Sequence, residues 1–296
     1  MFKSGFITII GRPNAGKSTL MNNLIGEEIS IITKKAGTTR NQIKGIWNTN
    51  EFQAVFLDTP GLSSDTSTKL DKIFWKTAFK SIEDVDLIFY LISGVANDIG
   101  FDKRDKEIIE TIRKKVKTNI VILISKIDIV ESNKLDILKT QINTWNKDIK
   151  TISYNSFNSS DLIKIKSEII DNLQEGEPYF FDDSITDMND SFFISEIIRK
   201  SILENLSQEL PHSINVKINE LENKKTMIKI QADLLVERDS QKGMVIGSKG
   251  KMIKKIGLES RKKIEELYNK KVLLETRVKV KKNWKNDDLY LKDFKI

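Results

Sequence analysis

The chain has 296 residues, a length that suits about two domains, and its 39% hydrophobic content is enough for ordinary packed cores. With no cysteine and one histidine, it excludes a disulfide framework, a cysteine nucleophile and a metal site built from histidine or cysteine clusters. The single His212 stands at the start of an expected strand, and we interpret it as structural. No apolar run of about 18 residues and no cleavage site after the segment MFKSGFITIIG are visible, so we expect a soluble, cytoplasmic protein.

The formal net charge of +7 is concentrated toward the C-terminus. Residues 240–285 contain 15 Lys and Arg against 4 Asp and Glu, a net charge of +11, so the rest of the chain carries −4. A localised basic stripe is typical of a surface that binds nucleic acid or an anionic membrane. On composition alone, a solvated lysine-rich surface is an equal alternative.

Short apolar runs alternate with amphipathic segments from residue 6 to residue 173. The expected strands are 6–11, 52–58, 86–93, 120–125 and 150–154, and segments such as 18–26 and 104–116 have helical spacing. This alternation predicts an α/β domain with a doubly wound, mostly parallel sheet over residues 1–173. The acidic stretch 174–190, QEGEPYFFDDSITDMND, is predicted as a linker because it lacks periodicity and contains Pro178.

Residues 191–296 predict a smaller α+β domain. Its expected elements are a helix at 192–206, strands at 213–223 and 225–237, a helix at 249–268 and a basic strand at 271–284.

The sequence GRPNAGKST at residues 11–19 fits the phosphate-loop pattern G-x-x-x-x-G-K-[ST] between an expected strand and an expected helix. The glycines let successive N–H groups face a polyphosphate at a helix N-terminus, Lys17 reaches the β- and γ-phosphates, and the Ser18 hydroxyl binds Mg²⁺. The predicted nucleotide-binding residues of this loop are Gly11, Arg12, Pro13, Asn14, Ala15, Gly16, Lys17, Ser18 and Thr19.

Two downstream segments extend the same predicted site. The sequence AGTTR at 36–40 supplies threonines on a loop, and we expect Thr39, with Thr38 left open, to complete the Mg²⁺ shell and sense the γ-phosphate. FLDTPG ends an apolar strand, so that Asp58 can hold the metal through water and the Gly61 N–H can meet the γ-phosphate. Either segment alone would be an ordinary turn, but in this order they predict one switch. Asp58, Thr59, Pro60, Gly61 and Leu62 are therefore predicted nucleotide contacts.

The sequence Ser-Lys-Ile-Asp at 125–128 follows an apolar strand and therefore emerges at the ligand-binding edge of the sheet. Asp128 can accept from both N1–H and the exocyclic amine of guanine, which adenine does not offer in that arrangement. Ser125 stands where asparagine is usual, so we expect weakened binding with the guanine preference kept. The alternative is an ordinary strand exit in a protein that reads another base. The predicted base contacts are Ser125, Lys126, Ile127 and Asp128, with Ser153 and the Tyr154 N–H near guanine O6.

In the basic C-terminal part, VIGSKGKMIKKIG places a G-x-x-G turn between a strand-like run and a helix. Such a turn lets the backbone approach the sugar–phosphate chain of about four single-stranded nucleotides, and Val245 and Ile246 can lie under the bases. The predicted RNA contacts are Ile246, Gly247, Ser248, Lys249, Gly250, Lys251 and Lys254.

Together, GRPNAGKST, TTR, DTPGL, the K-x-D base motif and MVIGSKGKMIKKIG resemble the Era family of bacterial GTPases over nearly the whole chain. The resemblance implies a P-loop GTPase domain followed by a type II KH domain, with GTP or GDP and Mg²⁺ as ligands. It also implies a role in biogenesis of the 30S ribosomal subunit, with the KH domain holding the 3′ end of 16S ribosomal RNA. The sequence departs from the family pattern at Ser125, where asparagine is usual, and at Tyr154, where alanine is usual.

Leu62 occupies the position where Ras-like GTPases place the glutamine that orients the attacking water. We therefore expect slow GTP hydrolysis that relies on Lys17, Thr39, Gly61 and Mg²⁺, with K⁺ near Asn14 as in related GTPases, and acceleration by a partner. We expect a monomer. Two alternatives stay open: an RNA-binding module with a vestigial GTPase domain, and peripheral attachment of the basic stripe to the inner membrane.

Overall fold

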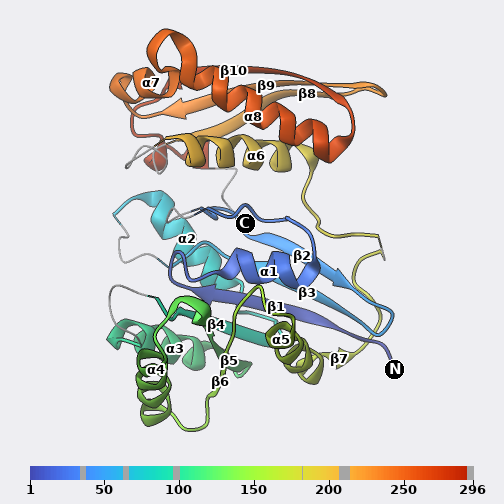
Figure 1. The fold of residues 1–296 in the computed structure, drawn as a ribbon, viewed down its shortest axis with the longest axis vertical. Coiled ribbons are helices and arrows are strands. Elements are labelled where there is room, and N and C mark those ends of the chain that lie inside the picture. The colour runs from blue at the N-terminus through green and yellow to red at the C-terminus, as the bar shows by residue number, and fades with distance from the viewer. Residues whose placement is uncertain (34–37, 63–66, 96–100, 182, 207–213, 292–296) are drawn as a thin grey trace. The chain divides into compact units, whose positions relative to one another are not determined.

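The computed structural model describes residues 1–33, 38–62, 67–95, 101–181, 183–206 and 214–291 (Figure 1). It divides into two compact units, the first formed by Met1–Asp187 and the second beginning at Met188. The first two residues of the predicted threonine loop, at 36 and 37, and His212 lie outside the described residues.

Among its described residues, the first unit contains a seven-stranded sheet with the order β2-β3-β1-β4-β5-β6, and β7 pairs with β1. The strands are β1 (Lys3–Gly11), β2 (Ile43–Asn48), β3 (Phe52–Asp58), β4 (Leu87–Ser93), β5 (Asn119–Ser125), β6 (Lys150–Ser153) and β7 (Gln174–Glu175). All pairs from β3 to β6 are parallel, whereas β2 and β7 run antiparallel to their neighbours. The predicted doubly wound, mostly parallel sheet is confirmed, and β2 is an edge strand that the sequence analysis missed.

The helices of this unit are α1 (Lys17–Ile25), α2 (Lys69–Lys80), α3 (Lys103–Lys115), α4 (Ser132–Trp145) and α5 (Ser159–Asn172), with a 3₁₀ turn η1 (Ile127–Ile129). Buried side chains of α2, α3 and α4 form one core with side chains of the central strands. The helices α1 and α5 lie on the opposite face of the sheet (Figure 1). The central strands are buried on both faces, which explains why their sequences are almost continuously apolar.

The segment predicted as a linker is bound to the first sheet as far as Asp187; we call residues 174–187 the strap. Its first two residues form β7, which pairs with β1. Farther along, the Ile46 N–H of β2 donates to the Ile185 carbonyl at 2.9 Å, and Lys44 Nζ lies 2.7 Å from Asp187 Oδ2. The contacts of the strap with β1 and β2 are mostly backbone hydrogen bonds and one ion pair, which an acidic sequence without periodicity can form.

The second unit contains α6 (Asp190–Asn205), β8 (Asn215–Asn223), β9 (Met227–Val236), α7 (Asp239–Ile246), η3 (Ser248–Gly250), α8 (Lys251–Tyr268), β10 (Lys271–Val280), η4 (Trp284–Asn286) and α9 (Asp288–Leu291). Its three described strands have the order β10-β9-β8, with β10 parallel and β8 antiparallel to β9. Isoleucines of α6 and α8 pack with the sheet in one core. The predicted α+β domain is therefore confirmed.

The segment before the G-x-x-G turn differs from the expectation. The predicted strand-like run is the end of helix α7, and only Val245 of its last three residues is buried. The helix starts where Gln241 Oε1 accepts from the N–H groups of Glu237 and Arg238, at 2.8 and 3.0 Å. Within the described parts of the chain, none of the helices has the length and apolar character needed to cross a membrane.

Candidate nucleotide and RNA sites

The phosphate loop connects the end of β1 to the start of α1 and curls around its own lysine. Gly16 and Asn14 have left-handed backbone angles, with φ of 97° and 60°. Lys17 is only 6% exposed, and its Nζ donates to the carbonyls of Gly11 and Arg12 at 3.2 and 2.9 Å. Desolvation lowers the pKa of Lys17 to about 8, although the charge of Asp58 opposes this shift. The loop thus holds a buried cation at a helix N-terminus, which suits a polyphosphate.

Three predicted metal ligands converge beside this lysine. Ser18 Oγ lies 2.9 Å from Thr39 Oγ1 and donates to Asp58 Oδ2 at 2.7 Å. Asp58 is fully buried, and burial raises its pKa against the opposing charge of Lys17. Its second oxygen, Oδ1, is buried without a hydrogen-bond partner among the described residues. A hard oxygen cluster with a free carboxylate oxygen fits Mg²⁺, which when bound would neutralise charge on the phosphates.

The structure favours Thr39 over Thr38 at this cluster, because the Thr38 hydroxyl lies 2.7 Å from that of Thr33. It also adds Ser30, which the sequence analysis missed. Ser30 Oγ donates to Asp58 Oδ2 at 2.9 Å, and the Asn22 side chain fixes the Ser30 backbone. Ser30 stands in an apolar run without a motif, so only the three-dimensional contact identifies it.

The segment after β3 packs directly on the phosphate loop. The buried Thr59 donates from Oγ1 to the Ile9 carbonyl at 2.8 Å, and the Leu62 N–H donates to the Gly11 carbonyl at 3.1 Å. Leu62, predicted as a nucleotide contact, places its side chain in the core with α2 and α3, while its backbone lies against the phosphate loop. An apolar side chain suits this buried position, where a glutamine would bury its amide.

Ser125 and Lys126 brace the phosphate loop from the end of β5. The Ser125 side chain is 1% exposed, and its Oγ donates to the Ala15 carbonyl at 2.7 Å. Lys126 has a left-handed backbone (φ 60°), and its Nζ donates to the Asn14 carbonyl at 2.7 Å. Burial lowers the pKa of Lys126 against the charge of Asp128. The Asp128 carboxylate, in η1, remains exposed, where it is open to a base.

The fifth predicted element differs in detail. The Tyr154 N–H, expected to meet guanine O6, donates to the Ile124 carbonyl at 2.9 Å as part of the β5–β6 ladder. The Tyr154 ring is fully buried, so the bulky residue is accommodated as core. Ser153 ends β6 at the same edge of the sheet. This amide is therefore engaged within the sheet.

In the second unit, the predicted RNA residues run from Ile246, the last residue of α7, through the turn at 247–250 to the first turn of α8. Gly247, Lys249 and Gly250 have positive φ angles of 71°, 50° and 73°, while Ser248 and Lys249 are exposed. A side chain at Gly247 would lie 2.6 Å from Met252 Cβ, so the turn requires glycine there. Lys251 and Lys254 are exposed on the first turns of α8, whereas Val245 is completely buried and cannot lie under a base.

Two protein-family models match this chain, one in each of the two units. A family model described as a 50S ribosome-binding GTPase matches residues 6–126, and one described as a KH domain matches residues 209–285. The GTPase Era of Caldicellulosiruptor saccharolyticus is 40% identical over 291 residues, which are 97% of this chain and 95% of that relative. The chain belongs to the Era family of GTPases.

Two solved Era structures resemble the whole chain. One is a single-residue variant of Aquifex aeolicus Era bound to GDP·AlF4⁻, with a TM-score of 0.93 and 34% identity over 99% of both chains. The other is Era in complex with MgGDPNP and nucleotides 1506–1542 of 16S ribosomal RNA, with the same TM-score, identity and coverage. The Era fold, a P-loop GTPase domain followed by a KH domain, is therefore the fold of this chain.

Proposed function

We propose that this Era-family chain binds and hydrolyses GTP with Mg²⁺, binds the 3′ region of 16S ribosomal RNA and thereby assists assembly of the 30S subunit. The observation that supports this most directly is the convergence of Lys17, Ser18, Thr39 and Asp58, with one buried carboxylate oxygen of Asp58 unpaired among the described residues. Burying a charged lysine and a carboxylate lowers the stability of a domain unless they are paired, so a GTPase domain without function would not be expected to retain both.

Each predicted residue has a role that its position can support. Lys17, held by two loop carbonyls, can turn to the β- and γ-phosphates, and Gly61 lies against Pro13 of the phosphate loop. Asp128 is exposed beside the loop that Lys126 braces, where it can accept from guanine N1–H and the exocyclic amine. Charge stabilisation by Lys17 and the metal replaces the water-orienting glutamine in this proposal, and slow turnover follows from that lack.

RNA binding rests on the shape of the G-x-x-G turn. Its positive-φ glycines bring the backbone to the surface at the start of α8, where N–H groups and exposed lysines can meet phosphates. A relative of the same fold has been solved with a 16S fragment. The basic residues would also suit anionic lipid headgroups, and flotation with anionic liposomes separates peripheral inner-membrane contact from RNA binding.

The decisive experiment is nucleotide competition against fluorescent GDP, with GDP, ADP and xanthosine diphosphate as competitors. The intact chain should prefer GDP. Asp128→Asn should shift the preference to xanthosine diphosphate, because an amide can donate to the carbonyl that replaces the guanine amine. Asp136→Asn, at an exposed aspartate of α4, is the matched control. Failure of any guanine nucleotide to bind the intact chain would overturn the proposal and leave RNA binding as the activity to study.

A monovalent cation at Asn14 is a separate part of the proposal. Asn14 has a left-handed backbone within the phosphate loop and is exposed. Turnover in K⁺ should exceed turnover in Na⁺, and equal rates would exclude the role for Asn14.

A further inference from the structure

A buried polar network lies between the phosphate loop and the first turn of α3. The Arg12 guanidinium forms a bidentate pair with Asp105, with Nε 3.1 Å from Oδ1 and Nη2 2.8 Å from Oδ2. The Tyr90 hydroxyl of β4 donates to Oδ1 at 2.7 Å, and the Asp102 N–H donates to Oδ2 at 3.2 Å. The Asp105 carboxylate thus accepts four hydrogen bonds.

This carboxylate is placed where a charge is unfavourable unless it is paired. Asp105 is 2% exposed, and its burial raises its pKa while Tyr90 and Arg12 oppose the shift. Asp105 also closes the capping box of α3, because its carboxylate accepts from the Asp102 N–H while Asp102 accepts from the Arg104 and Asp105 N–H groups. An exposed side chain can also cap a helix, so capping alone does not explain why the buried carboxylate of Asp105 forms a bidentate pair with Arg12.

Arg12 connects this network to the lysine of the nucleotide site. Its side chain is held by Asp105 and Asp102, and its carbonyl accepts from Lys17 Nζ at 2.9 Å. The same carbonyl accepts from the Ala15 N–H at 3.3 Å. Loss of the Arg12 side-chain contacts would therefore remove one constraint on the backbone that holds Lys17.

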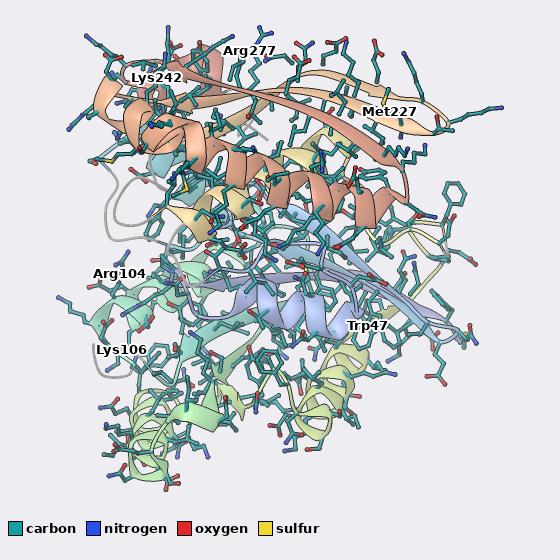
Figure 2. The ribbon with its side chains drawn as sticks, turned by 45° about the horizontal axis from the view of Figure 1, so that its top comes forward. Trp47, Arg104, Lys106, Met227, Lys242 and Arg277 are labelled. Carbon is teal, nitrogen blue, oxygen red and sulfur yellow. The ribbon has the colours of Figure 1, made fainter. Side chains whose placement is uncertain are left out.

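The first turn of α3 also reaches the segment after Asp58. Arg104 Nη2 donates to the Leu62 carbonyl at 3.3 Å, and the Leu62 N–H donates to the Gly11 carbonyl at 3.1 Å. Arg104 and its neighbour Lys106 are labelled in Figure 2 on α3. One helical turn therefore contacts both segments that are expected to surround the phosphates.

We propose that Asp105 is a positioning residue for nucleotide binding and hydrolysis: through Arg12 it fixes the phosphate loop that presents Lys17. The inference rests on the proposed GTPase function and adds a residue outside the recognised motifs. In this proposal the effect of Asp105 on the nucleotide passes mainly through Arg12, whose side chain pairs with Asp105 and whose carbonyl holds Lys17.

The test is Asp105→Asn in the full chain, with GDP affinity measured by titration, kcat and KM by GTP turnover, and stability by thermal unfolding. The substitution preserves size but replaces the buried, bidentate partner of Arg12 with a neutral amide and leaves only Asp102 as its charged partner, so we expect GDP binding and kcat each to fall by about tenfold. The matched control is Glu168→Gln, which removes a buried carboxylate that pairs with Lys150, at the start of β6. It should lower stability without changing GDP affinity.

A double-substitution cycle separates positioning from general destabilisation. Because Asp105 acts through Arg12, adding Asp105→Asn to Arg12→Gln should cause little further loss of GDP affinity. Tyr90→Phe removes one hydrogen-bond donor to Asp105 but keeps the ion pair with Arg12, so it should lower GDP affinity by less. This milder variant also tests the proposal if Asp105→Asn does not fold.

The proposal is overturned if Asp105→Asn and Tyr90→Phe lower the unfolding temperature as the control does but bind GDP like the parent. It is also overturned if the losses in Asp105→Asn and Arg12→Gln are additive. Failure of the unaltered chain to bind GDP would refute the proposed function instead, so the two failures are distinguishable.

Discussion

At the scale of the residue, Ser125 shows how a shorter side chain retains part of a family role. Its hydroxyl donates to the Ala15 carbonyl from a position that is 1% exposed. The structural brace on the phosphate loop is therefore kept, and only the donor that asparagine would offer to the base is lost. Weakened GDP binding with the guanine preference kept stays a prediction.

Two substitutions of Ser125 should change GDP affinity in opposite directions. Ser125→Ala leaves a buried carbonyl without its donor and should weaken GDP binding roughly fivefold, the effect of about 1 kcal/mol. Ser125→Asn restores a donor toward the base and should tighten it. Titration with fluorescent GDP measures both, with Ser132→Ala, an exposed serine of α4, as the control. Unchanged affinity in Ser125→Ala would show that the brace is not used.

Gly61 is fixed by close contact and not by its backbone angles. A Cβ there would lie 2.7 Å from the backbone N and Cα of Pro13, closer than real Cβ contacts. Gly61→Ala must therefore displace the segment after Asp58 from the phosphate loop. We expect kcat to fall by about tenfold while GDP affinity changes little, because the Gly61 N–H is predicted to meet the γ-phosphate, which GDP lacks.

Single-turnover GTP hydrolysis and GDP titration separate these two effects of Gly61→Ala. Gly257→Ala in α8, where a Cβ meets no described atom within 4 Å, is the control and should not change turnover. A parallel loss of GDP affinity in Gly61→Ala would contradict the assignment to the γ-phosphate side.

At the scale of the element, the strap is a bound segment and not a free tether. Gln53 of β3 is 0% exposed, and its Oε1 accepts from the N–H groups of Tyr179 and Phe180 at 2.7 and 3.0 Å. Its Nε2 donates to the Phe180 carbonyl at 2.9 Å. The strap also pairs with β2, which follows the predicted threonine loop in sequence, so a change in that loop has a short covalent path to the strap.

Removal of the Gln53 amide should loosen the strap selectively. Gln53→Leu leaves two N–H groups and a carbonyl without partners, a loss of about 2 to 4 kcal/mol in the free energy of unfolding. Hydrogen exchange should accelerate at Tyr179 and Phe180 while GDP affinity is kept. Gln141→Leu, at an exposed position of α4, should alter neither. Unaltered exchange in Gln53→Leu would mean that other contacts hold the strap.

At the scale of the whole molecule, the two activities belong to separate units, and the positive charge is concentrated in the second. The C-terminal window of +11 lies in the second unit, and Lys242 and Arg277 are among its basic side chains (Figure 2). The phosphate loop, the predicted Mg²⁺ ligands and the base motif all lie in the first unit. RNA affinity and nucleotide affinity should therefore respond to different substitutions.

The doubly substituted chain with Ser248→Asp and Lys249→Asp tests this separation. Both positions are exposed, so the fold should be kept, but carboxylates would face the RNA phosphates. Binding of a 16S 3′ fragment should fall at least about tenfold, with a shallower salt dependence, while GTP turnover without RNA stays unchanged.

The matched control for that charge change is Lys225→Asp with Thr226→Asp, in the exposed turn between β8 and β9. Equal losses of RNA affinity in the two variants would indicate that overall charge, and not the G-x-x-G turn, governs binding.

The sequence by itself determined the phosphate loop, the strand that ends in Asp58, the base motif, the alternating α/β order and the basic second domain. These features depend on residues that are close in sequence, because a few consecutive positions determine the local backbone shape and the side-chain periodicity. The tertiary structure alone decided that Ser30 joins Asp58, that Leu62 and Val245 are buried, that Asp105 holds Arg12, and that the predicted linker is bound to β2 and β3. Those contacts join residues that are far apart in the chain. They become favourable only when burial removes the polar groups from water, so that each can pair only with another group of the protein.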